Sequence, residues 1–165
     1  MELINRMRKN RKGFTLVEII VVLVILAILA AFTIPTMLGF VNDARGKALI
    51  TEAREVKLAA QATATEYVGK GTAVTADELG SAALVMPASG ATDSATSATK
   101  QMRIYLTKDI TPLATNPATT SPSNGSFWTI QLGTSTNGAQ VTGITYVKDG
   151  YTVTLNTSGS TVVKN

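Results

Sequence analysis

The chain has 165 residues, a net charge of +4, and neither cysteine nor histidine. Without these two residue types, zinc centres built on thiolate and imidazole ligands are excluded, as is catalysis by a Ser-His or Cys-His pair. The length fits one folded domain plus a separate N-terminal segment. The first third is aliphatic, whereas the remainder is rich in Thr, Ser, Ala and Gly.

The positive charge is concentrated in residues 1–13, a leader that holds five basic side chains and one acidic one. This leader accounts for the whole net charge, so the rest of the chain is neutral. A basic cluster directly before an apolar run is a positive-inside signal, which predicts a cytoplasmic leader and an exported C-terminus. Because the remainder is neutral, nucleic acid is not expected as its main partner.

The apolar run Phe14–Phe32 comes next, and Glu18 is its one charged residue. As a helix its 19 residues extend roughly 28 Å, close to the ~30 Å hydrocarbon core of a bilayer. The alternative is a secretory signal peptide, but Leu29-Ala30-Ala31 lacks the A-x-A pattern that such cleavage needs. We therefore expect residues 14–34 to stay attached as a transmembrane helix.

Pro35 follows the apolar run and has no N–H to donate to the carbonyl of Ala31. We expect a kink or local weakening of the helix between these residues. The hydroxyl of Thr33 or Thr36 is a candidate to satisfy freed backbone groups, which matters in lipid. A plainer interpretation is that the proline only marks the membrane interface.

Residues 35–68 are predicted to continue the helix in amphipathic form. One narrow apolar stripe advances in steps of four and three residues, with charged side chains on much of the remaining surface. Gly69 and Gly71 are expected to end the helix. The stripe consists of Leu49, Ala53, Val56, Ala60, Thr63 and Tyr67.

Residues 69–165 are predicted to form a globular head. Thr75–Glu78 matches a capping box, which indicates a short helix over about 76–84. The compositions of 88–99 and 111–126 predict loops. The segment Met102–Leu106 fits either a strand or a helical turn.

The C-terminal part alternates apolar and polar residues, as β-strands do. Strands are expected at Phe127–Leu132, Val141–Val147 and Tyr151–Leu155, with a hairpin turn at Asp149-Gly150. A short edge strand is expected at 161–163. The predicted fold class is α+β: a long N-terminal helix whose second half packs on a small antiparallel sheet.

The motif KGFTLVE, residues 12–18, resembles the class III signal of type IV prepilins and pseudopilins. The resemblance implies that prepilin peptidase cuts between Gly13 and Phe14 and methylates the new amine of Phe14. Glu18 matches the acidic residue at the fifth position after the cut, and Pro35 matches the helix-breaking proline of many pilins. A disulfide-bounded C-terminal loop has no counterpart here, which fits a Gram-positive or Cys-free branch.

The chemistry of Glu18 agrees with this resemblance. A carboxylate at mid-bilayer costs about 2.5–3.5 kcal/mol on insertion scales, and a paired cation lowers that cost. Phe14 and Glu18 lie roughly 6 Å apart along a helix. The resemblance implies that the cation is the amine of a neighbouring subunit; the plainer alternative is a glutamate stabilised by the helix dipole.

The resemblance implies a structural filament subunit, not an enzyme, with no cofactor or metal. Its expected partners are further copies in a helical homopolymer, prepilin peptidase, a membrane platform protein and an assembly ATPase. The expected location is the cytoplasmic membrane as a single-pass precursor, then an extracellular pilus used for twitching motility, adhesion, biofilm or DNA uptake. A pseudopilin of a type II secretion or competence system is the first alternative, and a membrane-anchored extracellular binding domain is the second.

Overall fold

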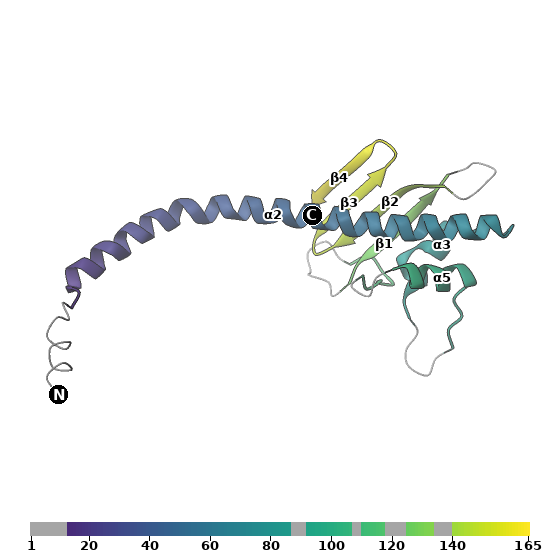
Figure 1. The fold of residues 1–165 in the computed structure, drawn as a ribbon, viewed down its shortest axis with the longest axis horizontal. Coiled ribbons are helices and arrows are strands. Elements are labelled where there is room, and N and C mark those ends of the chain that lie inside the picture. Colours follow the sequence, from purple (N-terminus) through teal and green to yellow (C-terminus); the bar gives the residue numbers. More distant parts are fainter. Residues whose placement is uncertain (1–12, 87–91, 107–109, 118–124, 134–139) are drawn as a thin grey trace, which may run out of the picture. The chain divides into compact units, whose positions relative to one another are not determined.

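The computed structural model describes residues 13–86, 92–106, 110–117, 125–133 and 140–165. The leader residues 1–12 and parts of both predicted loops, 88–91 and 118–124, lie outside the described residues. The described chain falls into two compact units, one up to Asp43 and one over Ala44–Asn165. Helix α2 (Leu16–Gly69) contributes to both. The second unit is an α+β head (Figure 1).

The head is built on the second half of α2. Its buried side chains confirm the predicted stripe, with only Tyr67 half-exposed, and add small residues beside it. Four of the buried side chains are alanines, which allow a sheet to approach the helix backbone closely. Thr63 is also buried, and its hydroxyl donates to the Ala59 carbonyl at 2.9 Å, so no polar group is left unsatisfied there. The buried residues are Gly46, Leu49, Ala53, Val56, Ala59, Ala60, Thr63 and Ala64.

The end of α2 confirms the role of its glycines. Gly71 has a positive φ of 74°, a conformation that side chains with a Cβ rarely adopt. The Thr72 N–H bonds the Tyr67 carbonyl and the Gly71 N–H bonds the Val68 carbonyl, both at 2.9 Å. This pair of bonds is a Schellman motif, which satisfies carbonyls that the last helical turn leaves without partners.

Three short helices follow: α3 (Ala76–Leu79), α4 (Ser81–Leu84) and α5 (Ser97–Tyr105). The capping box at Thr75 and Glu78 is present, but the predicted single helix is wrong because Gly80 is extended and separates α3 from α4. The loop prediction is also wrong over Ser97–Thr99, where α5 begins. The open alternative at Met102 resolves in favour of a helix.

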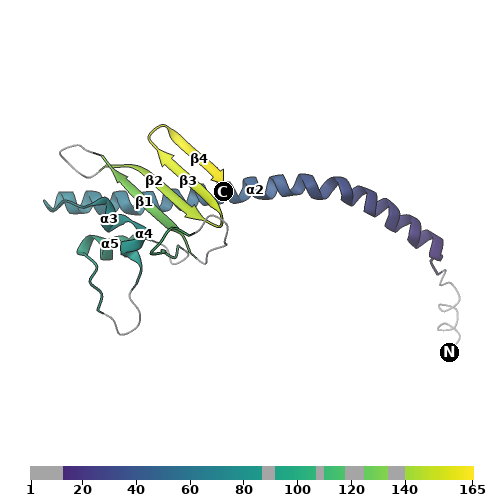
Figure 2. The same ribbon diagram turned by 180° about the vertical axis from the view of Figure 1, so that it is seen from behind.

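The sheet is an antiparallel meander in the order β1-β2-β3-β4, seen from both sides in Figures 1 and 2. Its strands are β1 (Phe127–Leu132), β2 (Val141–Lys148), β3 (Tyr151–Asn156) and β4 (Gly159–Lys164). All four predicted strands are confirmed, and β4 is longer than expected. Asp149 and Gly150 both have positive φ, 52° and 77°, as a type I′ hairpin turn requires.

The core lies between the helix stripe and one face of the sheet. Trp128 and Tyr146 are fully buried on adjacent strands and stack with their ring centroids 6.2 Å apart. The indole N–H donates to the Leu79 carbonyl at 3.0 Å, which ties α3 to the sheet. The single tryptophan of the chain thus joins the sheet to α3.

Candidate functional site

The N-terminal end of the described chain holds the residues of the sequence motif. Gly13, Phe14 and Thr15 precede the helix in a non-helical stretch, and all three are exposed. A Cβ placed on Gly13 would meet no atom within 4 Å. Among the described residues, nothing covers Gly13 and Phe14.

Thr15 caps the start of α2. Its hydroxyl oxygen accepts a hydrogen bond from the Glu18 N–H at 3.2 Å, and its carbonyl accepts one from the Ile19 N–H at 3.3 Å. Glu18 is thus the third residue of the helix, where the helix dipole favours a negative charge. The sequence T-L-V-E carries the Ser/Thr-x-x-Glu signature of a helix start, a signal that the sequence prediction of this segment did not use.

The apolar part of α2 is not covered by any other described residue of its own unit. The helix contains a stretch that is long and apolar enough to cross a membrane, and none of that stretch is buried. Leu16 is 75% exposed and Phe32 74% exposed. At about 25 cal/mol per Å² of apolar surface, such a helix is stable only in lipid or against other apolar helices.

The helix is unbroken at Pro35, so the predicted kink or weakening does not appear as an interruption. Thr36 donates to the Thr33 carbonyl at 2.9 Å and to the Phe32 carbonyl at 3.4 Å, and Thr33 donates to the Leu29 carbonyl. The two hydroxyls therefore bond carbonyls around the proline, as expected of threonines in lipid, but not the carbonyl of Ala31 itself.

A cluster of three polar side chains links α2 to the sheet. Glu52 on α2 accepts a hydrogen bond from the Tyr146 hydroxyl at 2.6 Å and an ion pair from Lys148 at 2.8 Å. Burial raises the pKa of the Tyr146 hydroxyl far above its ordinary value, and the bond to Glu52 raises it further. The hydroxyl therefore stays protonated and remains a donor. The sequence pattern gave no sign of this cluster, since its members lie 94 and 96 residues apart.

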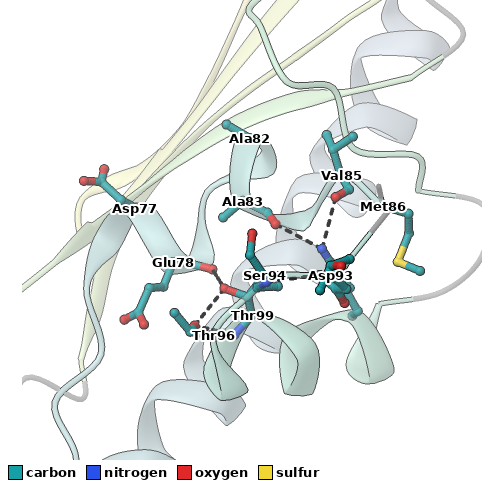
Figure 3. Close-up of a pocket in the computed structure, with 13 residues that line it drawn as sticks. Asp77, Glu78, Ala82, Ala83, Val85, Met86, Asp93, Ser94, Thr96 and Thr99 are labelled. Carbon is teal, nitrogen blue, oxygen red and sulfur yellow. Dashed lines mark hydrogen bonds and ion pairs between the residues drawn. The ribbon is translucent and has the colours of Figure 1, made fainter. Parts of the chain in front are cut away.

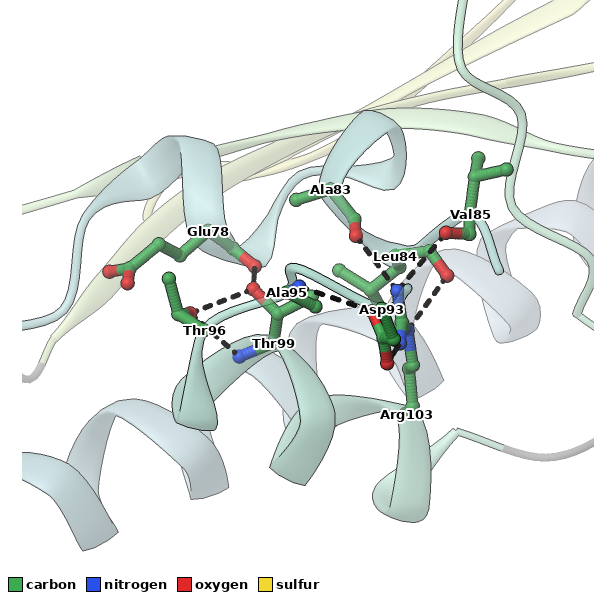
Figure 4. Close-up of polar contacts among 9 residues, drawn as sticks. All are labelled: Glu78, Ala83, Leu84, Val85, Asp93, Ala95, Thr96, Thr99 and Arg103. Carbon is green, nitrogen blue, oxygen red and sulfur yellow. Dashed lines mark hydrogen bonds and ion pairs between the residues drawn. The ribbon is translucent and has the colours of Figure 1, made fainter. Parts of the chain in front are cut away.

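One hollow of the head has a volume of about 480 Å³ and lies between α3, α4 and α5 (Figure 3). Arg103 occupies one side of it. Its guanidinium donates to the carbonyls of Ala83, Leu84 and Val85 at 3.0–3.2 Å and pairs with Asp93 at 2.7 Å (Figure 4). These bonds make Arg103 a clamp that closes the end of α4, so the hollow offers no uncommitted guanidinium to a ligand.

Acidic groups around the hollow are held ionised by local donors. The Ala95 N–H, and then Arg103, hold the pKa of Asp93 below its usual value. The Thr75 backbone N–H does the same for the pKa of Glu78. Within the described residues no group of three or more His, Cys, Asp or Glu side chains is placed to hold a metal ion. The arrangement stabilises α3–α5.

Comparison with known families identifies the N-terminal segment. Residues 8–34 match the family model described as the prokaryotic N-terminal methylation motif. Searches of curated proteins and of solved structures found no match to the chain. This motif supports a type IV pilin-like prepilin with a class III signal peptide, and the helix-on-sheet fold is consistent with a type IV pilin. The matched motif indicates a type IV pilin-like or pseudopilin protein.

Proposed function

We propose that this protein is a structural subunit, a major pilin, of a type IV pilus. The observation that carries the proposal is the combination of an exposed apolar helix with exposed Gly13 and Phe14 residues at its start. Such a helix needs lipid before assembly and other apolar helices after it. The matched motif implies that prepilin peptidase cuts this bond and that the new amine of Phe14 is methylated.

Glu18 is proposed to set the axial register of the filament. Its carboxylate lies near the helix N-terminus, in a stretch fit for lipid, where an unpaired charge is costly. A methylated amine on Phe14 of a neighbouring subunit remains cationic and supplies the counter-charge. The capping bond from the Glu18 N–H to the Thr15 hydroxyl holds only the backbone of Glu18 and does not occupy its carboxylate.

Pro35 is proposed to let the helix extend or melt locally during assembly. The proline removes one bond from the helix ladder, and Gly39 four residues later adds backbone freedom. The helix is continuous in the free subunit, so the change would accompany packing into the filament. Cryo-electron microscopy of the filament decides this, and a regular helix from Ala31 to Gly39 would contradict the proposal.

The leading experiment is to shear filaments from cells and to determine the N-terminus of their subunit by mass spectrometry. We expect abundant filaments whose subunit begins with methylated Phe14. In Gly13→Leu, a bulky side chain precedes the cut bond, and uncleaved precursor should accumulate in the membrane. A mature chain that begins at Met1 or near Ala31 would overturn the pilin assignment and favour a membrane-anchored binding domain.

The same preparation separates a pilin from a pseudopilin. A processed Phe14 terminus without abundant long filaments would favour a pseudopilin of a secretion or competence system. The chain carries long Thr-rich loops, which suit a surface-displayed pilin better. A platform protein and a cytoplasmic ATPase are the expected assembly partners, and twitching motility, adhesion, biofilm and DNA uptake are the candidate uses.

A further inference from the structure

The two edge strands of the sheet, β1 and β4, differ in how their outer backbone groups are covered. The β1 edge is closed, because α4 and the α3–α4 corner lie against it. The Trp128 N–H donates to the Ser81 hydroxyl at 3.1 Å, so α4 satisfies a backbone group on the outer side of β1. A Cβ built on Gly80 would lie 3.8 Å from the Trp128 carbonyl oxygen, which places the α3–α4 corner directly on this edge. The register also shifts between Gln131 and Leu132. An incoming strand would be blocked along β1.

Within the described residues, the β4 edge has none of these protections. The strand pairs with β3 over six residues without a register shift, and within the described residues no strand lies beyond it. It contains no proline, its one charge is Lys164 at the end, and every residue except Val162 is exposed. Natural proteins usually blunt an edge of this length with charges, prolines or bulges, because it is a template for another strand.

The outward-facing backbone groups of β4 follow from the ladder. The Asn165 N–H donates to the Gly150 carbonyl at 2.8 Å, so this pair is a hydrogen-bonded one. Antiparallel ladders alternate, which makes Thr152–Val163 and Thr154–Thr161 the next hydrogen-bonded pairs. The N–H and C=O groups of Ser160 and Val162 therefore face away from β3.

We propose that β4 is a docking edge for the β4 strand of a second copy, paired antiparallel with Val162 opposite Val162. The outward-facing residues of β4 have even numbers. Reversing the strand about Val162 pairs even-numbered residues with even-numbered residues, so the outward-facing backbone groups of the two copies meet. Ser160 then faces Lys164, so no like charges meet. On the exposed face of the sheet Thr161 lies beside Val163, a pair of β-branched residues that suits a sheet surface.

The symmetry of this contact determines what it joins. A two-fold axis reverses the direction of each subunit, whereas neighbours within one helical filament meet through heterologous contacts. The β4 pairing therefore links subunits of two separate filaments side by side. This goes beyond the proposed pilin function, and the pairing itself needs neither processing nor polymerisation.

Cysteine cross-linking tests the register, because the natural chain has no cysteine. In the proposed pair, positions 161 and 163 face each other as a non-hydrogen-bonded pair, about 4.5 Å apart at Cα and within reach of a disulfide. Full-length Thr161→Cys/Val163→Cys protein in detergent micelles, oxidised with diamide, should run as a dimer on a non-reducing gel. The matched control is Thr129→Cys/Gln131→Cys, with the same spacing on exposed positions of the closed β1 edge.

We expect at least about fivefold more dimer from the β4 pair than from the β1 pair, since cross-linking needs the ~4.5 Å approach. Adding Ser160→Pro removes an outward N–H without breaking a bond to β3, so the dimer should be lost. Unchanged Trp128 fluorescence shows that each variant is folded. Equal dimer from the two cysteine pairs, or dimer that survives Ser160→Pro in a folded head, overturns the proposal. Because the assay uses unassembled protein, its failure leaves the pilin function unaffected.

Discussion

Replacing Arg103 by methionine tests whether the guanidinium clamp holds α3–α5 in place. The substitution keeps the apolar stem but removes four bonds: three to the carbonyls of Ala83, Leu84 and Val85, and one to Asp93. The Arg103 side chain is only 14% exposed, so water replaces these bonds poorly. A hydrogen bond to a charged group contributes about 1.5–3 kcal/mol.

The net cost is smaller than the sum of the four bonds. The freed carbonyls border an open hollow, and Asp93 is 31% exposed, so water reaches part of the site. We therefore expect Arg103→Met to lower the free energy of unfolding of the head by about 3 kcal/mol. At roughly 4 °C per kcal/mol for a domain of this size, the midpoint should fall by about 12 °C.

The assay is thermal unfolding followed by tryptophan fluorescence of the full-length protein in detergent. Trp128 is the single tryptophan of the chain and is fully buried in the head, so its emission reports the head and not the apolar helix. Lys100→Met is the matched control, because it removes an exposed charge from the same helix. A midpoint for Arg103→Met within about 2 °C of the control would refute the clamp, since even one lost charged bond predicts more.

Three further predictions concern the other polar groups. Glu18→Ala and Glu18→Gln should both be cleaved at Gly13 but yield no sheared filaments, because neither side chain carries a counter-charge for the Phe14 amine. Wild-type numbers of filaments by electron microscopy would contradict this prediction. Tyr146→Phe should lose about 1 kcal/mol in denaturant unfolding, since the ring still stacks on Trp128 while the bond to Glu52 is gone; an unchanged midpoint would contradict the link. The folded head lowers the pKa values of Asp93 and Glu78. The ionised carboxylates therefore stabilise the head fully above their unfolded pKa values, about 3.9 for Asp and 4.3 for Glu. This stabilisation is lost as the pH falls through the lower pKa values of the folded head. Asp93→Asn should make that acid loss shallower, and an identical pH profile of unfolding would count against the assignment.

The elements with strong periodicity were predictable from the sequence. The stripe from Leu49 to Thr63 repeats with the helical period, and Trp128 and Ile130 repeat with the period of a strand. Both patterns arise from burial on one face, so the pattern and the contact have the same cause. The type I′ turn at Asp149-Gly150 was predictable because few residue pairs tolerate two positive φ values.

The α3–α5 region was predicted less well, because its helices depend on tertiary contacts. Gly80 divides the expected helix at the corner that packs against Trp128, a partner 48 positions later in the chain. Helix α5 has a local signal that composition obscured: Thr96 accepts a bond from the Thr99 N–H, and Ala98 and Met102 are buried four residues apart. Its Ser/Thr-rich start resembled a loop.

The candidate site was also predictable only in part. The motif around Gly13 and Glu18 is local, so a single sequence carried it. The Glu52–Tyr146 link and the Arg103 clamp join residues that only the fold brings together, and ion pairs of this kind leave no periodic trace. Pro35 lies inside a continuous helix, which is possible because a single proline removes only one ladder bond, and the kink or weakening expected there stays a prediction.

The alternation of side chains in the sheet has a consequence for how the protein can diversify. Tyr146, Val153 and Leu155 are buried in the same core as the alanines of the helix stripe. Thr145 and Thr154, one position away, face the other side and make no demand on that packing. Related chains are therefore expected to vary more at outer positions such as Thr145 and Thr154 than at the inner positions that hold the head to its helix, although Val147 is buried on the outer face as well. Sequence variation in such a head is expected to alternate along each strand, with variable outer positions between constant inner ones.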